Sequence, residues 1–164
     1  MKTKRDGEVA LLLRMLDEGF GGAAWHGPTL RGAVRGIKAR QAVWRPGPKR
    51  HCIAEIAVHC AYWKYAARRR MTGEKRGSFA MKGSNWFGLP AKLTDATWRE
   101  YTTLLDTTHA ALCETAASLS PRQLRTVPKG AKIDNARLLF GMALHDVYHA
   151  GQVRLIKSLM GGKR

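Results

Sequence analysis

The chain has 164 residues, of which 45% are hydrophobic and 25% are charged, a balance typical of a folded domain rather than a disordered one. No apolar stretch has the length of a membrane span or of a signal peptide's apolar region. We therefore expect residues 1–164 to form a single domain, with its core over about 8–160, in a cytoplasmic protein that has no membrane partner. The three cysteines (Cys52, Cys60 and Cys113) lack CxxC spacing, which favours reduced thiols.

The chain is strongly basic, because 29 Lys and Arg residues stand against 12 Asp and Glu, a formal net charge of +17. Such an excess can attract nucleic acid or an acidic substrate. The basic residues are spread from Lys2 to Arg164, and their densest run, within 64–76, has no interleaved aromatic motif. A nucleic-acid binder is therefore the least favoured of the functions considered below.

The first half of the chain predicts two helical arms. Apolar residues at 9, 12, 13, 16 and 20 form a helical stripe over 8–20. Two glycines then interrupt the arm, and Pro28 suits the first turn of a second piece over 29–37, so the first helix is expected to be broken. After the loop 44–48, the stripe of Cys52, Ile56, His59, Trp63 and Ala66 predicts a helix over about 51–71.

The second half predicts two more helices after a long connection over 73–93. Thr94 or Asp95 caps a helix over about 96–119, and Asp134 caps the last one, which contains 138–159. No strand pattern is present. The sequence thus predicts an all-α four-helix bundle in which a crossover joins the second and third helices, running the same way.

Three consecutive positions of the core-facing stripe in the last helix are polar: His145, His149 and Gln152. Polar groups at core positions are costly unless they are paired. Two histidines four residues apart project from one helix face and can share one metal ion. The pair is reminiscent of the zincin HExxH, but Asp146 stands in place of the glutamate and no His, Cys, Asp or Glu follows His149.

A third ligand must therefore come from upstream, where His59 lies in the core-facing stripe of the second helix. Glu55, one turn earlier, is a candidate to orient that ring or to reach bound water, or else is a surface residue. Gln152 is placed to hydrogen-bond a ligand. The remaining candidates are expected to lie in loops, caps or the core: His26, His51, His109 and Cys60.

These residues and their context resemble the DinB/YfiT-like superfamily over about residues 8–160. The similar segments are IAEIAVHCAYW around His59, HDVYHAGQV at 145–153, AWHGPTL at 24–30 and WRPGP at 44–48. The resemblance implies an up-down-down-up bundle, often a homodimer. It also implies a divalent ion, zinc or nickel, held by His59, His145 and His149, and relatives that use a low-molecular-weight thiol as co-substrate.

The combined interpretation is a metal-dependent enzyme acting on a small molecule, either a hydrolase or a low-molecular-weight-thiol transferase. Three histidines leave coordination positions open for water or a thiolate. Glu55, Asp146, Tyr148 and Gln152 are the candidates for supporting roles around the metal, although Asp146 falls one position off the stripe and is expected to be exposed or to contact another helix. The alternative is a non-catalytic metal-binding protein of stress response or interaction.

Overall fold

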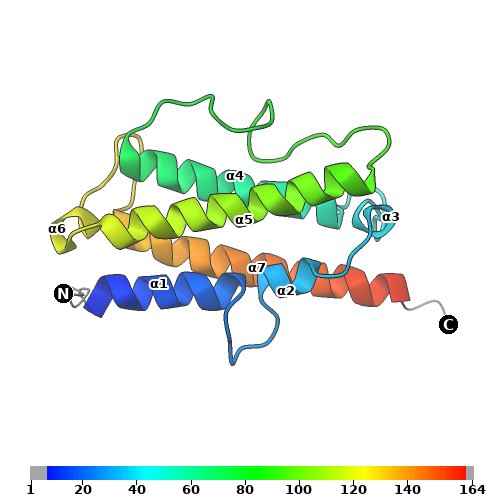
Figure 1. The fold of residues 1–164 in the computed structure, drawn as a ribbon, viewed down its shortest axis with the longest axis horizontal. Helices are drawn as coiled ribbons and strands as arrows, with labels where there is room; N and C mark the ends of the chain where they lie inside the picture. The colour runs from blue at the N-terminus through cyan, green and yellow to red at the C-terminus, as the bar shows by residue number, and fades with distance from the viewer. Residues whose placement is uncertain (1–6, 162–164) are drawn as a thin grey trace.

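The computed structural model describes residues 7–161, and these residues form helices and loops without any strand (Figure 1). The elements in chain order are α1 (Gly7–Phe20), α2 (Leu30–Val34), α3 (Ala39–Ala42), α4 (Ile53–Thr72), α5 (Asp95–Ser118), α6 (Pro121–Leu124) and α7 (Asn135–Gly161). The predicted helices are therefore present, with two short additions, α3 and α6. None of the helices in this part of the chain is long and apolar enough to span a membrane.

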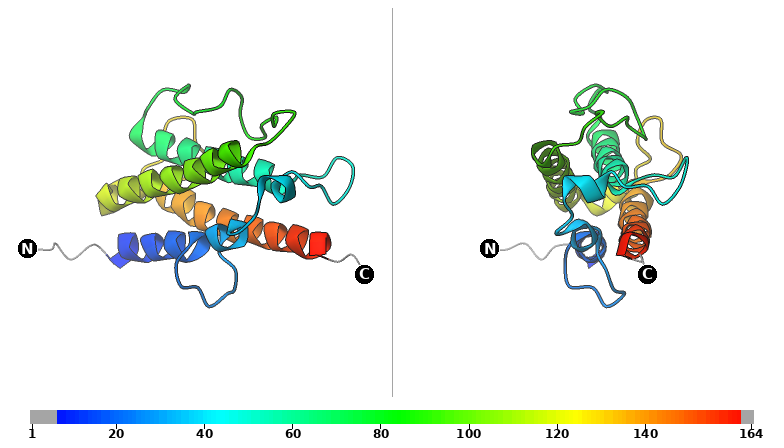
Figure 2. Two further views of the ribbon diagram at one scale, coloured as in Figure 1. Left: turned by 45° about the vertical axis from the view of Figure 1, so that its right-hand side comes forward. Right: turned by 90° about the vertical axis from the view of Figure 1, so that its right-hand side faces the viewer.

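The four long helices, α1, α4, α5 and α7, lie side by side as a bundle (Figure 2). α4 packs chiefly on α5, while α7 contacts α1, α2 and α4. Leu16, Leu112, Leu124 and Leu139 are fully or almost fully buried in one apolar cluster. A second cluster joins α2, α4, α5 and α7 around residues such as Leu105 and Val153.

The first arm is broken as predicted, because a loop separates α1 from α2. The side chain of Thr29 caps α2 by accepting a hydrogen bond from the backbone N–H of Gly32 at 3.2 Å. Lys157 on α7 donates to the backbone carbonyl of Ala33 at 3.1 Å. The buried Trp98 indole donates to the carbonyl of Ile37 at 2.7 Å, which joins the segment after α2 to the start of α5. These contacts fix the second piece of the arm against the bundle.

The long connection between α4 and α5 is packed against the bundle along α4 (Figure 1). Phe79 and Phe87 both contact the Tyr62 ring edge-on, with centroids 5.4 Å away in each case. The side-chain oxygen of Asn85 accepts a hydrogen bond from the Trp63 indole at 3.0 Å. The connection therefore lies against one face of α4, and this is the face that carries His59.

Candidate metal centre

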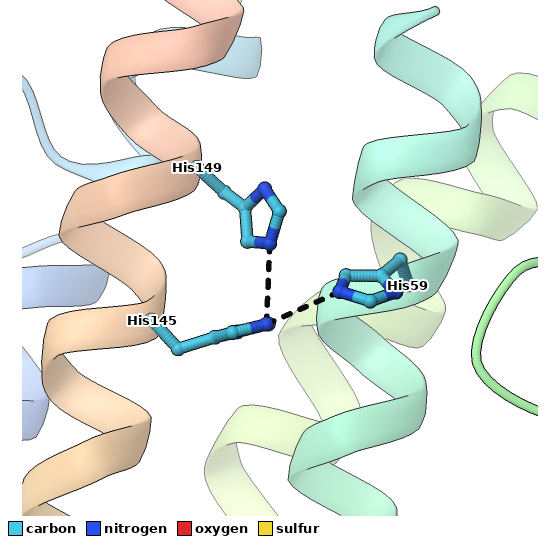
Figure 3. A group of neighbouring side chains, drawn as sticks. All are labelled: His59, His145 and His149. Atoms are coloured by element: carbon cyan, nitrogen blue, oxygen red, sulfur yellow. Dashed lines mark hydrogen bonds between the residues drawn. The ribbon is translucent and has the colours of Figure 1, made fainter. Parts of the chain in front are cut away.

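Three histidine side chains from two helices converge in the bundle (Figure 3). His59 projects from α4, and His145 and His149 project from successive turns of α7. The Nε2 atom of His145 lies 3.2 Å from Nε2 of His59 and 3.1 Å from Nε2 of His149. The structure thus brings together the trio that the sequence analysis singled out.

Hydrogen bonds on the far side of two rings fix which nitrogen carries the proton. Nδ1 of His59 lies 2.9 Å from the backbone carbonyl of Asn85, and Nδ1 of His149 lies 2.7 Å from the side-chain oxygen of Gln152. Because a carbonyl oxygen only accepts, each Nδ1 carries the hydrogen and each Nε2 presents a lone pair to the centre. Such outer hydrogen bonds are the usual support of metal-binding histidines.

Burial keeps these imidazoles uncharged. It lowers the pKa of His145 to about 3 and that of His149 to about 4, and it also lowers the pKa of His59. The three rings are therefore neutral near pH 7, which is the form that binds a metal ion.

The donor set fits a divalent ion. The three ligand nitrogens lie within 4.8 Å of one another, and His59 and His149 are buried. The Nε2 lone pairs of His59 and His149 both face Nε2 of His145. A neutral His145 can offer at most one N–H there, so it cannot donate a hydrogen bond to both. Three histidine nitrogens alone would leave a coordination position of such an ion open.

An aromatic column forms one wall of the centre. The Trp86 ring stacks on His59 at a centroid distance of 3.9 Å and on His51 at 3.5 Å. Trp86 and Asn85 belong to the long connection, and Asn85 takes a positive φ of 63°, a conformation that asparagine adopts more readily than most residues. Sequence reasoning did not assign either residue to the site, because only the tertiary packing of the connection brings them there.

The centre opens into a groove of about 1280 Å³ between α4, α7 and the loop before α4. Trp63, Trp86, Met142, Tyr148 and Ile156 are among its lining residues, together with the three histidines. Tyr148 is exposed, and its hydroxyl accepts a hydrogen bond from the Gln152 amide at 3.0 Å. Small-molecule sites are usually concave, mostly apolar spaces with a few polar groups, and the groove has this character.

Glu55 lies away from the three ring nitrogens and caps the start of α4. Its carboxylate accepts two hydrogen bonds from Arg45, each at 2.7 Å, and one from the backbone N–H of Cys52 at 3.0 Å. The expected orientation of the His59 ring by Glu55 is supplied instead by the carbonyl of Asn85. Burial tends to raise the Glu55 pKa, but Arg45 and the other donors lower it to about 2.

Replacing Glu55 with alanine is expected to lower the free energy of unfolding by about 1–2 kcal/mol, since a cap and an ion pair are lost together. A folded-state pKa of about 2 means that this contribution is present above the unfolded-state pKa near 4.3 and is lost as the pH falls towards 2. Urea unfolding at pH 7 and pH 3 measures the difference. Glu114→Ala, an exposed change on α5, is the control and should alter stability by less than about 0.5 kcal/mol. A Glu55→Ala loss equal to that of the control would contradict the assignment.

Asp146 pairs with Lys64 on α4, and both side chains are fully buried. One of its carboxylate oxygens also lies within 4.8 Å of a His145 ring nitrogen and of the Cys60 sulfur. Of the two alternatives expected for Asp146, exposed or in contact with another helix, the structure shows the second. Burial raises the pKa of its carboxyl while the Lys64 ammonium lowers it. One carboxylate oxygen, Oδ2, has no hydrogen-bond partner among the described residues. The missed signal is Lys64 itself, which lies four residues after Cys60 and three before Ala67, both buried positions of α4.

His109, His26 and His51 are not part of the three-histidine group, whereas Cys60 borders it through His145. His109 is buried in α5, where it stacks on Phe20 at 3.8 Å and lies 3.4 Å from the Cys113 sulfur. His26 is exposed in the loop after α1, and Cys60 is fully buried. His51, expected to pack in a loop or a cap, contacts both Glu55 and Trp86.

In the described residues, three histidines from two helices of an all-helical bundle converge. Together they offer the donor set of a mononuclear metal site. Residues 24–153 match the family model of the DinB superfamily, and the chain therefore belongs to that superfamily. This confirms the resemblance seen in the sequence. No curated protein and no solved structure gives a significant match.

Proposed function

We propose that the protein binds a divalent metal ion, zinc or nickel, through His59, His145 and His149, and that it is a metal-dependent enzyme within a single up-down-down-up bundle domain. The observation that carries the proposal is the convergence of three neutral imidazoles, with Nε2 of His145 lying 3.2 Å from that of His59 and 3.1 Å from that of His149. The tautomers of His59 and His149 are fixed by hydrogen bonds to Nδ1. The connection that packs along α4 supports the crossover topology.

When bound, such an ion supplies Lewis-acid chemistry, lowering the pKa of water or of a thiol and polarising a carbonyl. The chain's own residues do the rest. Asn85 and Gln152 hold two imidazoles in the binding tautomer. Tyr148 places a hydroxyl at the groove next to Gln152, where it can donate a hydrogen bond to a substrate. Hydrolysis and transfer to a low-molecular-weight thiol are the two reactions we propose.

Elemental analysis of purified protein tests the metal centre. We expect near-stoichiometric zinc or nickel in the wild type and in His26→Ala, a matched control at an exposed histidine. His59→Ala and His145→Ala should retain less than about one tenth of it, because each loses a ligand that the remaining two cannot replace. Helical circular dichroism shows that the variants remain folded. Full metal content in both ligand variants would refute the centre.

Activity is tested separately from metal content. The metal-loaded wild type is assayed with ester and amide substrates, and with electrophiles in the presence of glutathione, mycothiol or bacillithiol. We expect turnover that disappears in His145→Ala. A fully loaded protein that is inert against both panels would instead support a non-catalytic metal-binding role.

Removal of the Gln152 acceptor is expected to weaken metal binding about 10–100-fold, the usual effect of losing a hydrogen bond behind a metal-bound histidine. The Gln152→Leu variant leaves His149 Nδ1 without its partner at 2.7 Å, whereas Gln152→Glu keeps an acceptor. Competition with a chromophoric chelator measures both affinities. Unchanged affinity in Gln152→Leu would show that the bond does not support the ligand.

We also propose that two copies associate through α7. On a helical wheel, which turns 100° per residue, the exposed apolar residues of α7 fall on one side, within an arc of about 100°. Apart from Tyr148 of the groove, they are Phe140, Leu144, Leu155 and Leu159, between 45% and 61% exposed. Light scattering coupled to gel filtration should give the mass of a dimer for the wild type and that of a monomer for Leu144→Asp.

A further inference from the structure

The groove beside the histidines has a cationic rim that its lining does not neutralise. Lys49, Arg50 and Arg137 line it, and no aspartate or glutamate does so among the residues that the structure describes. All three cations are exposed, and none takes part in the ion pairs found within 7–161. Part of the chain's excess positive charge therefore lies at the rim of this groove.

Asp134 caps α7 beside Arg137, accepting a hydrogen bond from the Arg137 backbone N–H at 2.8 Å, but it does not line the groove. Two carboxylates closer to the histidines are already paired with other cations. Glu55 is held by Arg45 in a two-bond ion pair, and Asp146 is held by Lys64 in the interior. Neutral imidazoles would also leave the charge of a bound divalent ion uncompensated. The groove is thus positive at its rim, and it would also be positive at its centre with an ion bound; a low-dielectric wall strengthens the attraction for an anion.

The cations flank the histidines from two sides. Arg137 precedes His145 by eight residues on α7, about 12 Å along the helix axis. Lys49 and Arg50 lie in the loop that leads to His51, whose ring stacks on Trp86. Apolar lining residues, including Leu138, Met142 and Ile156, lie along α7 beside them. A ligand with an acidic group and an apolar part could therefore bind the rim cations through the first and pack against α7 through the second.

We propose that the groove binds a small organic anion, with a carboxylate, phosphate or sulfonate held by Lys49 and Arg50 and assisted by Arg137, and with its apolar body against α7. The inference rests on the proposed function in one respect, namely that this groove is the substrate site. It names the substrate class: an amphipathic acid rather than a neutral molecule. Anion binding at the rim does not itself need the metal.

Isothermal titration calorimetry at low salt tests the proposal by comparing the affinities of 2-naphthalenesulfonate and of its neutral counterpart, methyl 2-naphthyl sulfone. A sulfonate is a weak metal ligand, so its binding reports on the rim. We expect the sulfonate to bind at least about ten-fold more tightly than the sulfone. Lys49→Gln/Arg50→Gln should weaken sulfonate binding about ten-fold or more, since charge-assisted hydrogen bonds are lost, and Arg137→Gln should weaken it less. Arg154→Gln, an exposed change on α7 outside the groove lining that removes one charge as Arg137→Gln does, should change it less than about two-fold.

Equal binding of sulfonate and sulfone would overturn the proposal, as would equal weakening by Arg154→Gln and the rim variants. Displacement of the sulfonate by a DNA duplex at comparable affinity would also overturn it, because the rim would then be part of a nucleic-acid surface. The titration is run on metal-depleted and zinc-loaded protein. A protein that takes up no metal but prefers the sulfonate refutes the metal centre alone, whereas a loaded protein without that preference refutes the anion site alone.

Discussion

Lys64→Met is expected to destabilise the protein by about 3–5 kcal/mol, because it leaves the Asp146 carboxylate buried without its counter-charge. Both side chains of this pair have no exposed surface, and one Asp146 oxygen already lacks a hydrogen-bond partner. The loss would be a large part of the total stability of a domain of this size. Equilibrium unfolding in urea, followed by circular dichroism, measures it.

The double variant Lys64→Met/Asp146→Val is the control for this prediction. It replaces both charges with apolar groups of similar size, and replacing a whole buried ion pair is often neutral or even stabilising. We therefore expect the double variant to recover most of the stability that Lys64→Met loses. If the double variant is as unstable as the single one, the loss comes from the aliphatic packing of Lys64 and not from the unpaired charge.

Addition of zinc or nickel is expected to stabilise the folded wild type strongly. A free metal concentration 100 times the dissociation constant raises the free energy of unfolding by about 2.7 kcal/mol when only the folded state binds. For a chain of this length, that corresponds to a rise in Tm of roughly 5–10 °C. The rise should disappear in His145→Ala, because this variant lacks the Nε2 atom that lies between those of His59 and His149 in the wild type.

Differential scanning calorimetry at several metal concentrations gives the Tm values, and His26→Ala serves as the histidine control. A chelator added in excess should return the wild-type Tm to that of the metal-depleted protein. An equal rise in the wild type and in His145→Ala would place the binding at a different site.

The long helices could be predicted because each has a periodic apolar stripe, and α5 and α7 also have a local capping signal. Thr94 caps α5 through its side chain, as the sequence suggested, and Asp134 accepts a hydrogen bond from the backbone N–H of Arg137 at the start of α7. His145 and His149 were recognisable for the same reason, since their spacing of four residues is a local property. The DinB motifs around them led to the superfamily that the family match establishes.

The rest of the site depends on contacts between segments distant in the sequence. Trp86 reaches His59 only because the long connection packs along α4. Lys64 and Asp146 are 82 positions apart in the sequence, so nothing local to either residue predicts that they pair. The role of Glu55 stayed open in the sequence because a carboxylate one turn before a histidine suits more than one role. Only the positions of Arg45 and Cys52 show that it caps α4.

The acceptor behind His59 is a main-chain carbonyl, that of Asn85, and this affects how the site tolerates variation. No side-chain replacement at position 85 deletes that oxygen, so the tautomer of His59 should survive many substitutions in the connection. An insertion or a deletion between 73 and 94 would instead displace the carbonyl and uncouple the ring. Among related chains, the length of this segment should therefore be restricted more tightly than its sequence.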